Sequence, residues 1–191
     1  MSAPALQQPH PHRYSIVDYH RMGGAGIFAP DARVELIQGE IIDMTPIGSG
    51  HAGIVNKLNS IFYQMAGDNI IVSNQNPVVL NDFSEPQPDL ALLRYREDFY
   101  SKSHPRANDV LLIVEVADTT LQYDREIKLP LYASAGIPEV WLVDVEGKTV
   151  EIYSHPEEGR YALRENPDDL KSVKATALQG MSFDLSEMFG A

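Results

Sequence analysis

The chain has 191 residues, a formal net charge of −12 and no cysteine. This length is typical of one domain, and a hydrophobic content of 43% is enough for a substantial core. The lack of cysteine excludes disulfides, thiolate metal sites and cysteine nucleophiles, and it fits a reducing cytoplasm. The acidity argues against a protein that coats DNA, but it suits a site that attracts divalent cations.

The sequence shows no apolar stretch close to the roughly 18–20 residues that a membrane span needs. Its first residues form neither a basic n-region nor an apolar h-region, so we expect no secretory signal. We therefore expect a disordered tail over residues 1–12, a single domain over residues 13–191, no membrane partner and a cytoplasmic location.

The first predicted elements are a short helix and a hairpin. Residues 15–22 favour a helix, and the glycine-rich residues 23–26 favour a turn. Two short apolar-rich segments, 34–37 and 40–44, flank Gln38-Gly39. This arrangement predicts an N-terminal β-hairpin with a tight glycine turn.

A longer helix is predicted from Ser49 or Gly50, either of which can cap it, to about residue 66. Its apolar residues recur every three or four positions, which indicates one buried face: Ile54, Val55, Leu58, Ile61, Phe62 and Met65. His51 lies on the same stripe, in the first turn.

Two strands are expected next, at residues 70–73, with a continuation through 78–80, and at residues 89–93. A polar loop follows the second of them. Residues 94–106 of this loop carry four Lys or Arg against two acids, so the segment is locally positive and is our candidate surface for a phosphate backbone.

The apolar run at residues 110–117 predicts a central strand that is buried on both faces. A helix should then reach about residue 135, with Pro130 kinking it or delaying its regular start. Strands at 139–144 and 149–153 follow, and the C-terminal region is less clear. A strand, helix and strand of this length favour a right-handed parallel crossover, so we predict a mixed α/β fold whose central sheet carries helices on its faces.

Glu115 interrupts the central apolar run and is the most informative residue of the chain. An unpaired carboxylate there would cost several kcal/mol or shift its pKa until it is neutral. Asp89 opens the neighbouring apolar run, and two strand carboxylates can hold Mg²⁺ or Mn²⁺. The alternatives are a buried salt bridge of Glu115, for example with Arg125, and an Asp89 that merely starts a strand.

Lys128 follows in the next helical segment. It could orient or deprotonate an attacking water, or stabilise charge on a phosphorane-like transition state. The alternative is a surface pair with Asp124, four residues earlier. His51 could be a ligand or a proton carrier, although a core or capping histidine is the commoner outcome.

Glu35 and Glu40 lie on either side of the predicted hairpin turn. If the hairpin covers the carboxylate pair, one of the two could supply a third acid, with Glu40 slightly ahead. Exposed hairpin acids are common, so a solvated position is the alternative for both.

These residues resemble the Uma2 family of restriction-endonuclease-like proteins. The resemblance is carried by six segments between residues 15 and 155, namely residues 34–41, His51 at the start of a helix, and residues 88–92, 114–120, 124–128 and 132–144. Their order and spacing are specific together, although each is weak alone. The usual lysine two residues after the strand glutamate is replaced here by Ala117, and Lys128 in the following helix matches the position to which this family moves it.

The resemblance implies the PD-(D/E)XK nuclease fold, with Asp89 and Glu115 as metal ligands and Lys128 as the catalytic lysine. It leaves the roles of His51 and Glu40 open. The implied function is a Mg²⁺- or Mn²⁺-dependent DNA endonuclease, which we expect to be a homodimer because duplex cleavage calls for two sites. Two alternatives stay open: a non-catalytic nucleic-acid- or protein-binding module, and a hydrolase of another phosphoester.

Overall fold

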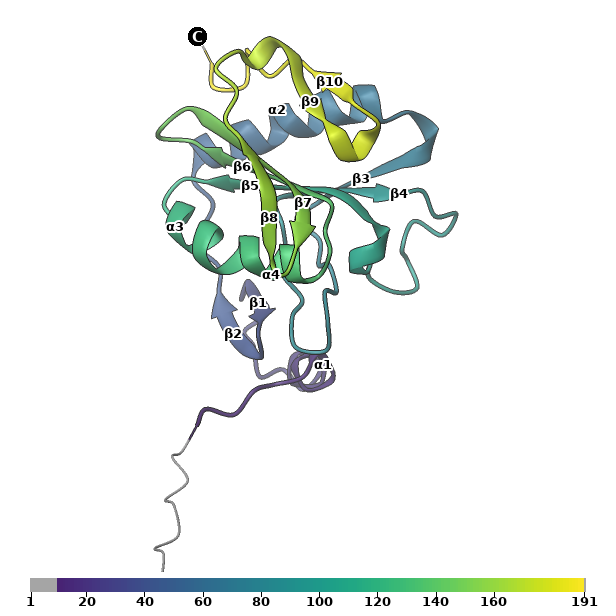
Figure 1. Cartoon of the computed structure of the whole chain (residues 1–191). Coiled ribbons are helices and arrows are strands. Elements are labelled where there is room, and N and C mark those ends of the chain that lie inside the picture. The colour runs from purple at the N-terminus through teal and green to yellow at the C-terminus, as the bar shows by residue number, and fades with distance from the viewer. Residues whose placement is uncertain (1–9, 191) are drawn as a thin grey trace, which may run out of the picture.

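A six-stranded mixed sheet forms the centre of the computed structural model, which describes residues 10–190 (Figure 1). The spatial order is β3-β4-β5-β6-β7-β8. Its strands are β3 (Ile70–Asn74), β4 (Leu90–Arg94), β5 (Val110–Ala117), β6 (Glu139–Asp144), β7 (Thr149–Glu157) and β8 (Arg160–Glu165). Only β5 and β6 run parallel within this sheet. The predicted mixed sheet with a parallel crossover is therefore confirmed.

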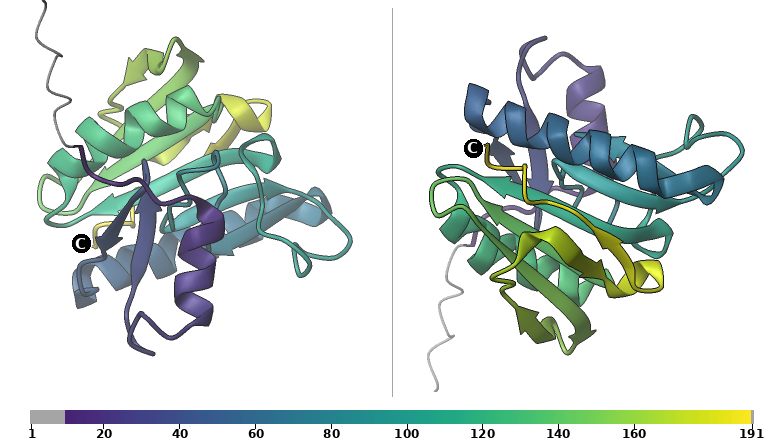
Figure 2. Two further views of the ribbon diagram at one scale, coloured as in Figure 1. Left: turned by 90° about the horizontal axis from the view of Figure 1, so that it is seen from below. Right: turned by 90° about the horizontal axis from the view of Figure 1, so that it is seen from above.

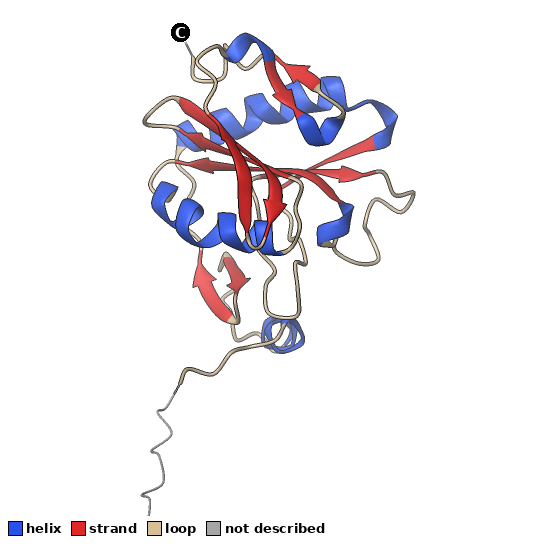
Figure 3. Cartoon of the chain, in the orientation of Figure 1, coloured by secondary structure: helices blue, strands red, loops and turns tan. Residues whose placement is uncertain are grey.

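Helices and a small C-terminal hairpin cover the two faces of the sheet (Figures 1 and 3). On one face lie α2 (Ser49–Ala66), β9 (Val173–Ala175) and β10 (Met181–Phe183), as Figure 2 shows from above. On the other face lie α3 (Leu121–Tyr123), the π-helical turn η3 (Asp124–Lys128) and α4 (Leu129–Ser134). Short 3₁₀ turns are η1 (Gly67–Asn69), η2 (Ala107–Asp109), η4 (Leu170–Ser172) and η5 (Thr176–Leu178).

The predicted apolar stripe of α2 faces the core, because Ile54, Val55, Leu58 and Phe62 are all buried. Met65 is 45% exposed, so the apolar stripe of α2 is open to solvent at its last turn. Aromatic contacts extend this core, with the Phe62 ring near those of Trp141 and Phe183. The sheet thus separates this apolar layer from a second one, on its other face, in which buried side chains pack around Tyr132 of α4.

The segment after β5 is helical, as predicted, but it is not one regular helix. A π-helical turn separates α3 from α4, and Pro130 lies in the first turn of α4. Proline cannot donate a backbone hydrogen bond to the preceding turn, and a π-turn relieves that mismatch. The insertion leaves both Asp124 and Lys128 buried, four residues apart.

The N-terminal hairpin pairs β1 (Val34–Ile37) with β2 (Glu40–Asp43), as predicted. Gln38 and Gly39 both have positive φ, the conformation that a two-residue type I′ turn requires. A Cβ on Gly39 would also come 2.6 Å from Arg13 Cβ. Seen from below, the hairpin and α1 (Ile16–Gly24) lie side by side under the sheet (Figure 2).

Two expectations need correction. Residues 23–24 end α1 rather than forming a turn, since the Ser15–Asp18 capping box starts a helix of nine residues. Residues 78–80 form no strand, and Val79 makes an isolated bridge to Arg106. The tail expected over residues 1–12 lies mostly outside the described residues, and residues 10–12 are exposed without regular structure. Across residues 10–190 we find no helix with the length and apolarity to cross a membrane.

An ion cluster on β7 ties the sheet to η3. Glu151 is almost fully buried and accepts hydrogen bonds from Arg125 Nη2 at 2.5 Å, Arg164 Nη2 at 2.9 Å and the Tyr153 hydroxyl at 2.5 Å. Burial acts to raise the pKa of Glu151, but the hydrogen bonds from Arg125 and Tyr153 outweigh it and lower the pKa. Arg125 thus forms its ion pair with Glu151 and does not pair with Glu115.

Replacing Glu151 with alanine is expected to lower the free energy of unfolding by about 2 kcal/mol, since three donors lose their acceptor. The loss should shrink in acid, because a carboxyl with a lowered folded pKa stabilises above its unfolded pKa and stops doing so as pH falls through its folded value. Urea denaturation at pH 7 and pH 3.5 measures both effects. An exposed acid on the neighbouring turn, Glu158, is the matched control for alanine substitution.

Candidate functional site

A pocket of about 390 Å³ opens beyond the carboxyl end of β5. The start of α2, the strand β2 with the loop after it, and the turn before α3 form its walls. It brings together most of the residues that the sequence indicated: Asp89, Glu115, Lys128, His51 and Glu35. Ends of parallel strands are common ligand sites in open α/β sheets, which fits this position.

Asp89 and Glu115 both line this pocket. Asp89 comes directly before β4, and Glu115 lies near the end of the neighbouring strand β5. The Asp89 side chain reaches β5, where it accepts from the Val116 N–H, and after burial its charge is among the causes that raise the pKa of Glu115. Both carboxylates can thus act on a cation that enters the pocket.

Three donors fix the Asp89 carboxylate. Its Oδ2 accepts from the Val116 N–H at 2.9 Å and lies 3.0 Å from His51 Nε2, and its Oδ1 accepts from Gln75 Nε2 at 3.2 Å. Burial acts to lower the pKa of His51, but the stronger effect of the Asp89 hydrogen bond raises it. His51 therefore holds Asp89 in place and is not an isolated core histidine.

Glu115 is a buried carboxyl at the pocket wall, and two side chains donate hydrogen bonds to it. Its Oε1 accepts from the Tyr132 hydroxyl at 2.5 Å and from Lys128 Nζ at 3.2 Å. Burial raises the pKa of the Glu115 carboxyl to about 8, against the opposing effect of the Lys128 charge. An added positive charge beside Glu115 would therefore stabilise its ionised form.

Lys128 lies between two carboxylates, with its Nζ 3.2 Å from Glu115 and 3.3 Å from Glu35. Burial acts to lower the Lys128 pKa, but these two carboxylates together raise it well above its usual value. Lys128 is thus a permanent cation at neutral pH, suited to stabilising charge rather than to removing a proton. The expected alternative, a surface pair with Asp124, does not fit a lysine that is only 6% exposed.

The two hairpin glutamates differ in position. Glu35 is buried, pairs with Lys128 and accepts from the Gln87 N–H at 3.1 Å. Glu40 is exposed beside the hairpin turn and lines a separate hollow with His10 and Arg13. The structure therefore brings Glu35, and not Glu40, to the carboxylate pair.

Some residues at the site carried no clear signal in the sequence. Tyr132 is buried and does not line the pocket, but its hydroxyl donates to Glu115. Asp124 is buried, accepts from the Thr120 hydroxyl at 2.8 Å, and has a raised pKa because of burial. The π-helical turn and the residue before it place Asp124 and Tyr123 at the pocket. No sequence pattern predicts such a turn.

The donor set fits a hard divalent cation held by few protein ligands. Within residues 10–190 no group of three or more His, Asp or Glu side chains is arranged to hold a metal ion. Asp89 and Glu115 would leave most coordination positions to water or substrate oxygens, as Mg²⁺ usually requires. The raised pKa of Glu115 supports this fit, since a cation would offset the cost of its burial.

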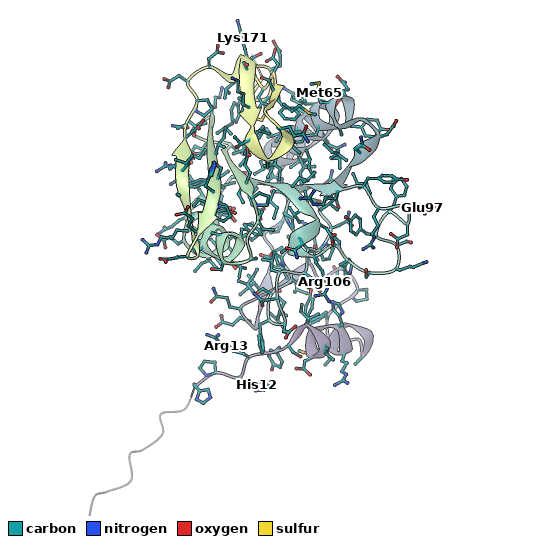
Figure 4. All side chains as sticks on the ribbon, turned by 45° about the vertical axis from the view of Figure 1, so that its right-hand side comes forward. His12, Arg13, Met65, Glu97, Arg106 and Lys171 are labelled. Atoms are coloured by element: carbon teal, nitrogen blue, oxygen red, sulfur yellow. The ribbon has the colours of Figure 1, made fainter. Side chains whose placement is uncertain are left out.

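The positive segment 94–106 lies at the other end of β4 from Asp89 (Figure 1). Five strand residues separate the two ends, which corresponds to roughly 16 Å. Residues of α1 and of this loop line a hollow that we call the basic hollow, formed in part by His20, Lys102, His104 and Arg106. Figure 4 shows Arg106 on the side of α1 and Glu97 farther out on the loop.

Comparison with known proteins agrees with this architecture. A solved structure titled a putative nuclease belonging to DUF820, from Anabaena variabilis ATCC 29413, superimposes with a TM-score of 0.70 at 14% identity, covering 92% of this chain and 97% of that one. That likeness confirms the predicted mixed α/β fold. None of the curated proteins matches the chain. The profile of the Uma2 family, described as "Putative restriction endonuclease", matches residues 16–186. The chain therefore belongs to the Uma2 family.

Proposed function

We propose that this protein is a Mg²⁺- or Mn²⁺-dependent nuclease that hydrolyses phosphodiester bonds of DNA, with residues 13–191 acting as one domain. The observation that carries the proposal is the pocket that two carboxylates, Asp89 and Glu115, line together with the buried cation Lys128, which contacts Glu115. Membership of the Uma2 family and the likeness to a nuclease-like fold support it. A fold by itself does not establish an activity, so the site has to be tested.

Asp89 and Glu115 would hold the ion, which when bound would polarise the scissile phosphate and acidify a water. His51, Gln75 and the Val116 N–H keep the Asp89 carboxylate in one orientation. Tyr132 does the same for Glu115. Preorganised ligands of this kind need no rearrangement when substrate arrives.

Lys128 would stabilise the negative charge that develops on the phosphate. Its amine carries a fixed charge because Glu35 and Glu115 flank it. A lysine with a raised pKa is a poor base, so the proton of the attacking water would pass to solvent water in the open pocket. Glu35 acts on Lys128 as a positioning residue.

The pocket itself is acidic. It contains six carboxyl side chains, Glu35, Asp43, Asp89, Glu115, Asp118 and Asp124, against the cations Arg33 and Lys128 and the imidazole of His51. Such a lining attracts divalent cations and repels a bare phosphodiester. Substrate binding in the pocket should therefore depend on the metal.

A cleavage assay tests the proposal. Plasmid DNA, single-stranded DNA, RNA and a small phosphodiester are incubated with the protein and Mg²⁺ or Mn²⁺, with chelator as the blank. Metal-dependent DNA cleavage is the expected result. Turnover of the small phosphodiester alone would favour a hydrolase of another phosphoester, and metal-dependent binding without cleavage would favour a non-catalytic binding module.

Replacing Lys102 and Arg106 together with glutamate is expected to weaken DNA binding and to reduce the dependence of affinity on salt concentration by about one unit of slope per lost phosphate contact. In the described part of the chain, no carboxylate lies within 4 Å of either cation, which leaves both free for phosphates. Metal affinity should not change. Reversing the exposed charges of Arg160 and Lys171 serves as control, and an unchanged salt titration would mean that DNA enters elsewhere.

We also propose that the active form is a homodimer, because cleavage of both strands calls for two sites related by a twofold axis. The apolar segment 137–153 belongs to the core and offers no such contact, since Ile137, Val140, Trp141 and Val143 are fully buried. Another surface must supply the contact. Sedimentation at micromolar concentration tests the dimer, and a monomer would count against it.

A further inference from the structure

Two polar atoms at the pocket are buried without a hydrogen-bond partner: the Tyr123 hydroxyl oxygen and His51 Nδ1. In the described part of the chain one other side-chain atom shares this condition, Glu85 Oε2, and Glu85 does not line the pocket. Buried polar groups are nearly always paired. An unpaired one at a pocket wall therefore indicates a partner that comes from outside the protein.

The charges of Glu35, Asp124 and Glu115 act on Tyr123, yet none of these carboxylates accepts a hydrogen bond from its hydroxyl. Asp124 Oδ2 accepts from Thr120, and Glu35 Oε2 lies 3.3 Å from Lys128. The nearby buried Tyr132, which does not line the pocket, differs because its hydroxyl donates to Glu115. Tyr123 thus presents a hydroxyl that the protein leaves free for a ligand.

The chemistry of the group favours an anionic oxygen as its partner. Burial, with the nearby Glu35 carboxylate, raises the pKa of Tyr123 to about 12, so the phenol is neutral and can donate at neutral pH. The charge of Lys128 is shared between two carboxylates. A phosphodiester that enters the pocket would bring non-bridging oxygens that need donors besides Lys128.

We propose that the Tyr123 hydroxyl donates a hydrogen bond to a non-bridging oxygen of the phosphodiester that occupies the pocket. This makes Tyr123 a substrate-contacting residue at the turn where α3 meets η3. The inference rests on the proposed function, because it takes the substrate to be a phosphodiester.

Tyr123→Phe removes the hydroxyl and nothing else, and the first measurement is its melting temperature without metal or DNA. Because the hydroxyl has no partner in the protein, the variant should melt at the same temperature as the wild type or higher. Tyr63→Phe, on the exposed face of α2, is the matched control. A clear fall in melting temperature for Tyr123→Phe alone would show a structural hydrogen bond and overturn the proposal.

The second measurement is binding of a short DNA duplex in Ca²⁺, followed by cleavage in Mn²⁺. Tyr123→Phe should bind about ten-fold more weakly, and Tyr63→Phe should bind like the wild type. Sulfur is a poor hydrogen-bond acceptor. One of the two phosphorothioate configurations at the scissile position should therefore weaken DNA binding by the wild type and leave DNA binding by Tyr123→Phe unchanged.

The outcomes separate this inference from the proposed function. If the wild type cleaves DNA and Tyr123→Phe binds and cleaves equally well, the inference is wrong and the nuclease assignment stands. The inference is also wrong if both phosphorothioates slow cleavage by both proteins to the same extent. The partner of the Tyr123 hydroxyl would then be a water in the pocket and not a phosphate oxygen. A wild type that neither binds nor cleaves DNA with any divalent ion would reject the proposed function itself.

Discussion

Replacing Asp89 with asparagine is expected to lower metal-dependent DNA cleavage by about a thousandfold or more, which corresponds to about 4 kcal/mol of transition-state stabilisation. Asparagine has the same shape, so its carbonyl oxygen can still accept from the Val116 N–H, whereas its NH2 group cannot accept from Gln75 Nε2. It lacks the negative charge that a hard cation requires. The rate of cleavage under saturating Mn²⁺ measures the loss.

Metal binding gives a second readout that does not depend on catalysis. A ligand that binds the folded state alone raises the melting temperature, so Mn²⁺ should stabilise the wild type and have little effect on Asp89→Asn. Asp68→Asn, an exposed residue in η1, is the matched control and should behave like the wild type. Cleavage at the wild-type rate by Asp89→Asn would remove Asp89 from the metal site.

The sheet could be predicted from the sequence because its signals are local. Apolar runs identify β4, β5 and β6, and Gln38-Gly39 identifies the hairpin turn. The distance from β5 to β6 then implies a parallel crossover. The strands β8 to β10 are harder to predict, because β8 is largely exposed and β9 and β10 have three residues each.

The assembly of the site depended on how these elements dock. The proximity of Asp89 and Glu115 could be predicted because Asp89 begins one apolar run and Glu115 interrupts the next. The position of Lys128 could be predicted because the helix after the central strand packs back over the sheet. Nothing in the local sequence distinguishes Glu35 from Glu40, since both flank the same turn. Only the docking of the hairpin buries Glu35 against Lys128 and leaves Glu40 outside the pocket.

Replacing Lys128 with methionine is expected to lower the free energy of unfolding by about 3–5 kcal/mol at pH 8, because it leaves two buried carboxylates without their cation. Methionine preserves most of the side-chain volume, so the loss reports mainly on charge. Glu35 and Glu115, at 3% and 4% exposure, have little access to water as a substitute. Urea denaturation measures the change, with the exposed Lys171→Met as control.

The effect of Lys128→Met should depend on pH with a defined sign. The pKa of Glu115 is already raised to about 8 in the folded protein, and loss of the lysine charge raises it further. Between the unfolded pKa, near 4.5, and that raised value the folded state binds the extra proton. Stability therefore falls as pH rises through this window. Well below pH 8 the Glu115 carboxyl is protonated in both folded proteins, so the variant should lose more stability than the wild type as pH rises from 8 to 10.

A second substitution shows whether charge is the cause. Adding Glu35→Gln to Lys128→Met removes one of the two orphaned carboxylates and should restore part of the lost stability at pH 8. Double-mutant analysis is appropriate because the two side chains are in contact. If Lys128→Met is as stable as the wild type at pH 8, the buried ion cluster does not hold the pocket together, and the role of Lys128 would rest on catalysis alone.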